Sequence, residues 1–554
     1  MYPHSRFIRI VYIFMKSNKS AAVWVPAIVA VAFAAGLFLG ARFFQSGSEW
    51  NTRVKIGEIM DLITEEYVDE VNTDSILEVS IPDILAKLDP HTVYIPASEL
   101  QATNEVLDGS FGGIGVVFSM QNDTATVMEV VSGGPAEKVG LLAGDRIVTV
   151  NDSVVAGIKI ESENIRKKLK GPKGSAVKIG IKRSNSKDIL SFEVVRGDIP
   201  VTAVDASYMI RPGIGYIRVN KFGRTTYMEF MNAMVGLRAA GAKRLILDLR
   251  GNTGGYMEPA ILMANEFLGA GMPIVSTHGR AGNIESDFAG DGQGAFGDTE
   301  LVVVIDEGSA SASEIFAGAI QDNDRGLIVG RRSFGKGLVQ RQIELPDSSA
   351  IRLTTARYYT PSGRCIQKPY TLGSSDDYEL EIYTRFDNGE GFSADSAKID
   401  TTKIFTTAGG RVVYGGGGIM PDVFVAGDTT GVSPYYIKVF NAGMLHRFAF
   451  FFTDTHRESL SKAESVEELL SLLPSDEIIL NSFVEFARDK GNIPPRWYYI
   501  NISRDLIVRQ LKSLISSDVL GQAALFEVSN ESDPAILRAI KELSDGNAVS
   551  PVSQ

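Results

Sequence analysis

The stretch that decides the fold runs from Leu301 to Gln340 and reads LVVVIDEGSASASEIFAGAIQDNDRGLIVGRRSFGKGLVQ. It opens with a β-branched apolar run, turns through small residues and continues as a helical pattern, which predicts a strand, a tight loop and a helix. The loop would hold serine hydroxyls at a helix N-terminus, where backbone N–H groups lack partners inside the helix. Lys336 follows on a second loop and is flanked by glycines. The pattern favours a serine nucleophile with a lysine base.

Composition narrows the class of protein. A chain of 554 residues is long enough for several domains of roughly 100–200 residues each. Contents of 44% hydrophobic and 22% charged residues are ordinary for folded protein. The formal net charge of -12 argues against a nucleic-acid partner bound through phosphate contacts. Cys365 is the only cysteine, so it cannot form an internal disulfide, and we interpret it as a structural residue.

The N-terminus resembles a membrane-targeting segment. Four basic residues precede an uncharged run from Ala21 to Ala41: Arg6, Arg9, Lys16 and Lys19. Roughly 20 apolar residues span a bilayer core, and a basic flank favours a cytoplasmic N-terminus. We therefore expect residues 1–20 to be cytoplasmic and residues 21–41 to be a single-pass signal anchor in a bacterial inner membrane. The remaining chain would lie on the periplasmic side, and cleavage of the segment is the alternative.

Residues 42–108 form a mainly helical region by their spacing, and the second helix in it stops at a turn, Asp89-Pro90-His91. We assign His91 to the turn rather than to catalysis. Residues 109–197 have a different pattern, with a glycine loop, several strands and two short helices.

The order of elements in residues 109–197 resembles a PDZ domain. The resemblance implies that Gly113, Ile114 and Gly115 form the loop whose backbone N–H groups bind a peptide's C-terminal carboxylate, while the peptide adds to the sheet as a strand. A tight turn without a ligand is the alternative interpretation.

Residues 198–426 read as an α/β domain. Strand patterns at Ile214–Val219 and Leu245–Arg250 alternate with helical patterns such as Tyr227–Ala240, which predicts a mostly parallel sheet covered on both faces. Residues 366–413 are polar and poorly patterned, and we expect a long loop or insertion there. Residues 427–554 are mainly helical by pattern, with a disordered end from Asp545.

The chemistry of the central stretch needs a base, because a serine hydroxyl is a weak nucleophile until its proton is removed. None of the five histidines lies in a recognisable strand-end context near an aspartate. A lysine can replace histidine when burial lowers its pKa. Gln340 follows Lys336 by four residues and could orient its amine. The N–H of Ala312, with Gly254 and Gly255 after the neighbouring strand, would form an oxyanion hole.

Two alternatives remain on these grounds. Ser309 and Ser313 compete with Ser311 as the nucleophile, and all three could serve only in capping and turns. Gly330–Lys336 also fits a phosphate-binding loop. However, Gly337 stands where that loop needs Ser or Thr, and the following residues alternate like a strand rather than a helix.

Taken together, the motifs resemble the C-terminal processing, or tail-specific, serine proteases. They occur in family order over roughly residues 50–425 and are Leu88–His91, the PDZ segment, Leu247–Arg250 with Gly254-Gly255, Gly308–Ile315, Phe334–Gly337 with Gln340, and Leu353–Arg364. The resemblance implies an α/β fold with a Clp protease/crotonase-like core of strand–helix units, an inserted PDZ domain, an N-terminal transmembrane helix and a helical C-terminal extension.

The family pattern also selects residues. Its nucleophile is the middle serine of Ser-Ala-Ser-Ala-Ser, which is Ser311, and its lysine lies 25 residues later, which is Lys336. Gln340 matches the residue that positions the lysine, and Asp322 matches an acidic position implicated in some members. No metal and no cofactor is implied. Asp306, Gly251 and Thr253 depart from the usual residues of the family.

These expectations combine into a membrane-anchored extracytoplasmic endopeptidase. Its PDZ domain would bind protein substrates by their apolar C-terminal ends, and its helical tail would dimerise, dock an adaptor or pack on the core. A catalytically inactive PDZ scaffold is the alternative, which the joint presence of Ser311, Lys336 and Gln340 disfavours. A crotonase-like acyl-thioester enzyme is compatible with the fold alone, and the PDZ domain disfavours it.

Overall fold

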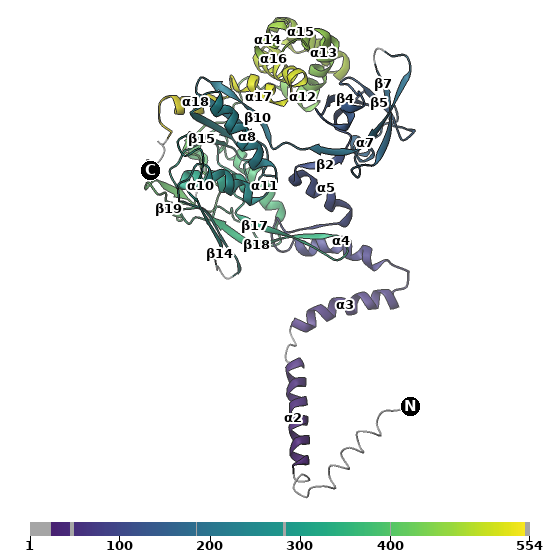
Figure 1. Ribbon diagram of the computed structural model, residues 1–554, viewed down its shortest axis with the longest axis vertical. Coiled ribbons are helices and arrows are strands. Elements are labelled where there is room, and N and C mark those ends of the chain that lie inside the picture. The colour runs from purple at the N-terminus through teal and green to yellow at the C-terminus, as the bar shows by residue number, and fades with distance from the viewer. Residues whose placement is uncertain (1–23, 45–48, 184–185, 281–283, 399, 549–554) are drawn as a thin grey trace. The chain divides into compact units, whose positions relative to one another are not determined.

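The computed structural model describes residues 24–44, 49–183, 186–280, 284–398 and 400–548, which fall into two compact units, 1–84 and 85–554 (Figure 1). The first unit contains helices α2 (Val25–Phe44) and α3 (Glu49–Glu66) and most of α4 (Thr73–Leu85). All catalytic candidates lie in the second unit.

The expected signal anchor at 21–41 is not supported. Within the described ranges, none of the helices combines the length and the apolar character that a membrane crossing requires. The predicted cytoplasmic segment, residues 1–20, lies outside the described residues.

The catalytic domain is built on a six-stranded sheet in the order β10-β11-β12-β15-β16-β21. Its strands are β10 (Val204–Arg211), β11 (Ile214–Val219), β12 (Arg244–Asp248), β15 (Glu300–Ile305), β16 (Leu327–Gly330) and β21 (Val423–Phe424). Only β10 runs antiparallel to its neighbour, so the predicted mostly parallel α/β sheet is confirmed. The register pairs Asp248 with Val304, which brings the chain after β12 and the chain after β15 out at the same edge.

Helices cover both faces of this sheet, as alternating apolar residues in its strands require. One face packs with α8 (Thr226–Ala239), α9 (Met257–Asn265) and α10 (Ala312–Asp322) in the largest core cluster. The other face packs with α18 (Pro534–Ser544), which comes from the C-terminal region.

A second sheet lies in the same unit and has the order β1-β18-β13-β14, with β17 paired to β18. Its strands are β1 (Val93–Ile95), β13 (Pro273–His278), β14 (Ile284–Ala289), β17 (Leu338–Glu344) and β18 (Ala350–Tyr359). Because β1 pairs with β18, the short stretch around Val93–Ile95, which precedes the PDZ segment, belongs structurally to the same domain as β18.

The PDZ segment forms its own sheet, β3-β4-β5-β7-β8, around a separate apolar core. The strands are β3 (Val116–Gln121), β4 (Thr124–Val130), β5 (Arg146–Val150), β7 (Ala176–Lys182) and β8 (Ile189–Val195), and the longer helix is α7 (Ser162–Leu169). Strands β2 (Ser110–Gly113) and β9 (Gly197–Pro200) pair where the chain enters and leaves the domain.

The prediction of a long loop at residues 366–413 is wrong in part. This segment contains helix α11 (Ser375–Asp387) and a hairpin of β19 (Ile404–Thr406) and β20 (Val412–Tyr414). Polar and aromatic contacts hold α11. Arg385 donates to the carbonyls of Ser333 at 2.8 Å and Phe334 at 3.0 Å, and the buried Tyr378 ring packs edge-on against Phe334.

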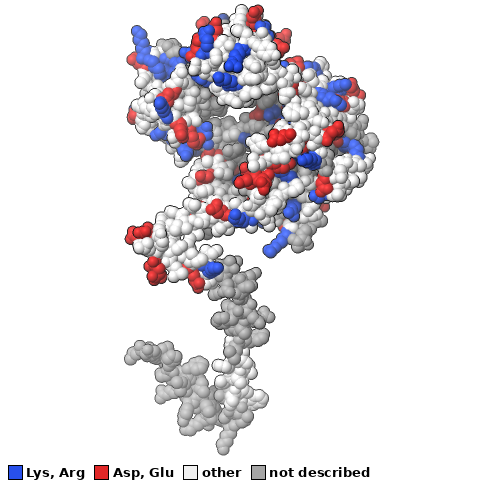
Figure 2. All heavy atoms as spheres, turned by 180° about the vertical axis from the view of Figure 1, so that it is seen from behind, with Lys and Arg blue, Asp and Glu red and all other residues white. Residues whose placement is uncertain are grey.

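The C-terminal region is helical, as expected. Helices α12 (Pro434–Asn441), α13 (Met444–Leu460), α14 (Val466–Leu472), α15 (Asp476–Gly491) and α16 (Trp497–Leu520) share one apolar core, and α17 (Gln522–Asn530) and α18 follow. The disordered end expected from Asp545 is wrong in part: Asn547 donates to Glu542 at 2.8 Å, and Ala548 is buried in the core of the central sheet. Residues from 549 onwards lie outside the described residues. On the face shown in Figure 2, acidic and basic side chains intermingle over the folded part of the chain.

The C-terminal end of α10 is held by a buried ion pair. Arg364 Nη2 lies 2.7 Å from Asp322 Oδ1, and both side chains are fully buried. Asp322 also accepts hydrogen bonds from Thr360 Oγ1 and from the Ser362 hydroxyl at 2.7 Å. The pair therefore fixes the turn after β18 against α10.

Replacing Asp322 with Ala should destabilise the fold by about 3–5 kcal/mol, because Arg364 would stay buried without its anion. Chemical denaturation measures this change. Asp298→Ala is the matched control, since it removes an exposed ion pair with Arg238 and should cost less than about 1 kcal/mol. Equal effects of the two substitutions would contradict the structural role of Asp322.

Candidate active site

Ser311 occupies a strained turn between β15 and α10. Its φ of 57° lies in the left-handed region, which non-glycine residues rarely adopt. Gly254 packs against it so closely that a Cβ on Gly254 would lie 2.8 Å from the Ser311 Cβ. Ser311 and Glu314 form the capping box of α10. Among the described residues, the Ser311 hydroxyl donates to no acceptor, so its proton is available at the start of the helix.

The neighbouring serines are engaged elsewhere. The Ser309 hydroxyl donates to the Leu249 carbonyl at 2.8 Å, and the Ser313 hydroxyl donates to the Asn252 carbonyl at 2.8 Å. Both residues are fully buried. Their hydroxyls tie the turn to the chain that follows β12, so the geometry distinguishes Ser311 from its two competitors.

Lys336 lies on the loop before β17, and its ammonium nitrogen donates to Gln340 Oε1 at 2.9 Å. Burial lowers the pKa of Lys336, and Arg352 lowers it further, while Glu314 and Asp89 oppose them, with a result of about 8. At pH 7 roughly a tenth of the amine is therefore neutral and can accept a proton, and the fraction rises as the pH approaches 8. Among the described residues, no hydrogen bond joins Lys336 Nζ to Ser311 Oγ.

A turn distant in sequence orients Gln340. The Gln340 side-chain amide donates to the His91 carbonyl, which turns the amide oxygen toward Lys336. Asp89 holds the turn by accepting the N–H groups of His91 at 2.9 Å and Thr92 at 3.0 Å. Burial lowers the pKa of the His91 ring to about 4, and its Nε2 lies 2.9 Å from the Tyr378 hydroxyl. His91 thus acts in the turn, as expected, and its carbonyl has a positioning role that the sequence did not reveal.

Glu314 is the residue of this site that the sequence analysis missed. Its buried carboxylate accepts four hydrogen bonds, from the N–H of Ser311 at 2.8 Å, the Ser333 hydroxyl at 2.5 Å and the N–H groups of Gly335 at 2.7 Å and Lys336 at 2.8 Å. Burial raises the pKa of Glu314 and these donors oppose the rise. A glutamate three residues after a serine is a capping-box pattern, which was the available signal.

Two backbone N–H groups are free to stabilise an oxyanion. The N–H groups of Ala312 and Gly255 have no hydrogen-bond acceptor in the described part of the chain. The Gly254 N–H, in contrast, donates to Asn252 Oδ1 at 2.9 Å. The prediction that Gly254 donates to the oxyanion is therefore not supported. Gly254 instead allows the backbone to approach Ser311 closely.

The candidate residues line one cavity of about 630 Å³. Ser311, Ala312, Lys336 and Gln340 share it with Gly254 and Gly255, and apolar side chains such as Leu107, Ile315 and Leu338 complete its wall. The cavity is large enough for a segment of extended peptide.

Asp322 does not belong to this site. It lies at the far end of α10, about 16 Å along the helix axis from Ser311, and its carboxylate pairs with Arg364. The catalytic assignment of Asp322 is therefore not supported. The phosphate-loop alternative also fails, because Lys336 is followed by strand β17 rather than by a helix.

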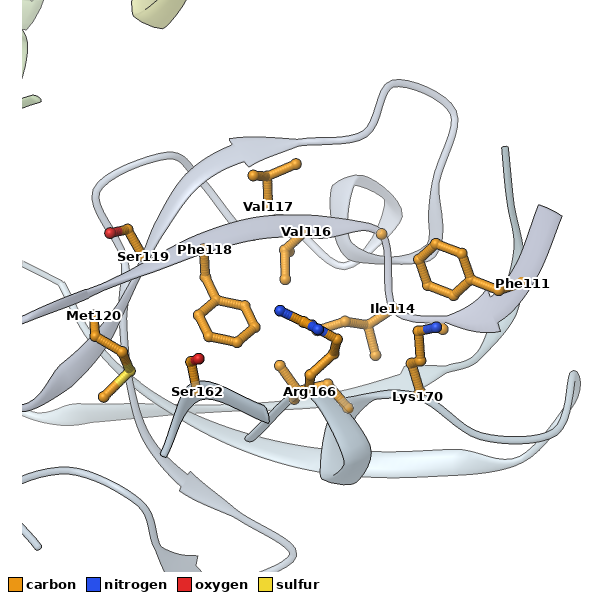
Figure 3. A pocket seen from close by; sticks show the side chains of 13 residues that line it. Phe111, Ile114, Val116, Val117, Phe118, Ser119, Met120, Ser162, Arg166 and Lys170 are labelled. Carbon is orange, nitrogen blue, oxygen red and sulfur yellow. The ribbon is translucent and has the colours of Figure 1, made fainter. Parts of the chain in front are cut away.

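The PDZ domain carries a second cavity, of about 500 Å³, between β3 and α7 (Figure 3). Gly113, Ile114 and Gly115 line one part of it, as the resemblance implied. Strand β3 is the outer strand of its sheet, so its free edge can pair with an added peptide strand. The Arg166 side chain from α7 points into the groove beside Phe118 (Figure 3).

Comparisons with known proteins agree with this architecture. The model of peptidase family S41 matches residues 213–380, a PDZ model matches residues 112–195, and a family of unknown function matches residues 435–521. A carboxy-terminal-processing protease of Bartonella bacilliformis is 35% identical over 364 residues, which are 63% of this chain and 82% of that protein.

Two further relatives have similar names. The carboxy-terminal processing protease CtpB of Bacillus subtilis is 34% identical over 57% of this chain and 65% of its own length. A solved photosystem II D1 C-terminal processing protease is 29% identical, covers 56% of this chain and 84% of its own, and has a TM-score of 0.32. A serine in a strained turn and a half-buried lysine line one cavity. With the matches to the S41 and PDZ models and the 35% identity to a relative covered over 82% of its length, the chain belongs to the carboxy-terminal-processing serine proteases of peptidase family S41.

Proposed function

We propose that the chain is a serine endopeptidase in which Ser311 is the nucleophile and Lys336 is the general base. One observation carries the proposal: the Ser311 hydroxyl, which donates to no acceptor among the described residues, and a lysine whose pKa is lowered to about 8 line the same cavity. Gln340 supports it, because an acceptor at 2.9 Å binds an N–H of the amine and leaves the lone pair of the neutral amine for a proton from Ser311.

The reaction follows from these positions. Neutral Lys336 accepts the Ser311 proton as Oγ attacks the peptide carbonyl, and the N–H groups of Ala312 and Gly255 stabilise the oxyanion. The C–N bond then breaks, and Lys336 gives the proton to the leaving amine. Water attacks the acyl carbon while Lys336 takes a proton from it. The bond between the acyl carbon and Ser311 Oγ then breaks, and Lys336 returns the proton to Oγ, which releases the carboxylic acid and restores the serine.

The PDZ groove would select the substrate. We propose that an apolar C-terminal end adds to the free edge of β3, with its carboxylate at the Gly113–Gly115 loop. Apolar lining by Val116, Phe118 and Leu169 supports an apolar side chain at this position.

A location outside the cytoplasm stays a prediction. It depends on the basic residues that precede the uncharged run from Ala21 to Ala41. Recovery of the catalytic region from the cytoplasmic fraction of lysed cells would contradict it.

The proposed pair predicts that Ser311→Ala and Lys336→Ala each lower casein hydrolysis by at least about a thousandfold, because neither group alone completes the proton transfer. Thermal melting should stay near that of the wild type. Ser207→Ala and Lys243→Ala are matched controls at exposed positions and should keep full activity. Near-normal hydrolysis by either active-site variant would disprove the pair.

The lysine also predicts a pH dependence. Since only the neutral amine is a base, kcat/KM should rise about tenfold per pH unit below about pH 8 and level off above it. Arg352→Gln removes a cation that lowers the pKa of Lys336, so the midpoint should move to higher pH, by roughly half a unit or more. Arg352→Lys keeps the charge and should keep the midpoint. A midpoint that moves down in Arg352→Gln would contradict the assignment.

The groove predicts recognition of a free carboxylate. In the full-length Ser311→Ala protein, a labelled peptide with an apolar C-terminal residue should bind at least about tenfold more tightly than its C-terminal amide, because the loop N–H groups pair with an anion. Fluorescence anisotropy measures both affinities. Equal affinities would show that the groove does not read the C-terminus.

A further inference from the structure

The last two helices of the chain, α17 and α18, lie outside all three family matches. They are nevertheless part of the catalytic domain. Ile536, Ala539 and Leu543 of α18 are buried against Ile246 and Val304 of the central sheet. Figure 1 shows α18 beside β15, the strand that leads to Ser311. The C-terminal region therefore reaches the sheet from which the active-site loops emerge.

Asp533 connects α18 to one of these loops. It caps α18, because its Oδ1 accepts the N–H groups of Ala535 at 2.9 Å and Ile536 at 3.1 Å. Its second oxygen, Oδ2, accepts a hydrogen bond from Arg250 Nη1 at 2.8 Å. The side chains of Arg250 and Asp533 are 17% and 25% exposed, so solvent screens this pair only partly.

Arg250 immediately precedes the loop that contains Gly254 and Gly255. Its Nη2 donates to Asp248 Oδ2 at 2.7 Å, and its backbone N–H donates to Asp248 Oδ1 at 3.0 Å. Its carbonyl accepts from Arg218 Nη2 at 2.9 Å. Both the backbone and the side chain of Arg250 are thus held where the chain leaves β12 for the oxyanion loop.

The loop continues this connection to the nucleophile. The Asn252 carbonyl accepts the Ala310 N–H at 3.0 Å and the Ser313 hydroxyl at 2.8 Å, and its side-chain oxygen holds the Gly254 N–H. A shift of Arg250 would therefore displace the Gly255 N–H and the turn that contains Ser311.

Arg250 contacts two carboxylates, those of Asp248 and Asp533. The buried Asp248 carboxylate also faces the guanidinium group of Arg218. Burial would raise the pKa of Asp248, but Arg250 and Arg218 together lower it to about 2. Asp205 Oδ2 lies 3.7 Å from Arg218 Nε and is the second carboxylate at Arg218. Asp533 is the second carboxylate at Arg250, and it joins this cluster of charges to α18.

We propose that Asp533 is a positioning residue for catalysis, which holds the oxyanion loop in place through Arg250. The inference rests on the proposed function of Ser311 and Lys336. It gives the C-terminal helices a role in setting the active site, beyond covering the sheet.

The test compares full-length variants that separate charge from capping. Asparagine caps helices as well as aspartate, so Asp533→Asn keeps α18 and removes the anion from Arg250. Its kcat should fall roughly tenfold while KM changes by less than about twofold, because an oxyanion donor acts in the transition state. Asp533→Glu, which keeps the charge, should restore most of the loss. Glu531→Gln is the matched control, since it removes the ion pair of the same region with Arg211 on β10, and it should keep the wild-type kcat.

Three results would overturn the proposal: an unchanged kcat in Asp533→Asn, an equal loss in Glu531→Gln, or a loss of activity that only follows a fall in melting temperature. Ser311→Ala, assayed in parallel, separates a failure of the proposed function from a failure of the proposed role of Asp533. If Ser311→Ala stays active, the proposed function fails. If it is inactive while Asp533→Asn is normal, only the role of Asp533 fails.

Discussion

The active site depends on the four hydrogen bonds that the buried Glu314 carboxylate accepts. Burying an ion costs several kcal/mol unless hydrogen bonds replace its water, and here four donors do so. Two of these donors are the backbone N–H groups of Ser311 and Lys336. The turn with Ser311 and the loop with Lys336 are therefore both bound to the Glu314 carboxylate, which couples their positions. A neutral side chain of the same size could not accept from all four donors.

Around this anchor, three distant parts of the chain set the state of Lys336. Arg352 on β18 and burial lower the pKa of Lys336, while Glu314 on α10 and Asp89 in the turn before β1 raise it. The same turn orients Gln340 through the His91 carbonyl. The turn at Asp89–His91, which precedes the PDZ domain, thus takes part in the same site as β17 and β18, although it lies far from them in sequence.

The sequence predicts what local pattern determines. The strand, turn and helix from Leu301 to Asp322 follow from apolar periodicity, and family spacing selected Ser311. Features decided by tertiary contacts were missed or misplaced. Asp322 is an acidic residue near the motif in sequence, but the helix carries it away to Arg364. The Gly254 N–H donates to the Asn252 side chain. Helix α11 is held by tertiary contacts of two residues, Arg385 and the buried Tyr378, which do not form a helical apolar pattern in the sequence.

Covalent labelling tests the central claim most directly. The full-length protein would be treated with a fluorophosphonate from about pH 6 to about pH 10, and the modified residue identified by peptide mapping. The account predicts a single adduct on Ser311, absent in Lys336→Ala, whose rate of formation rises with a midpoint of about pH 8, the pKa of Lys336. An adduct on Ser309 or Ser313, or a rate independent of pH and of Lys336, would contradict it.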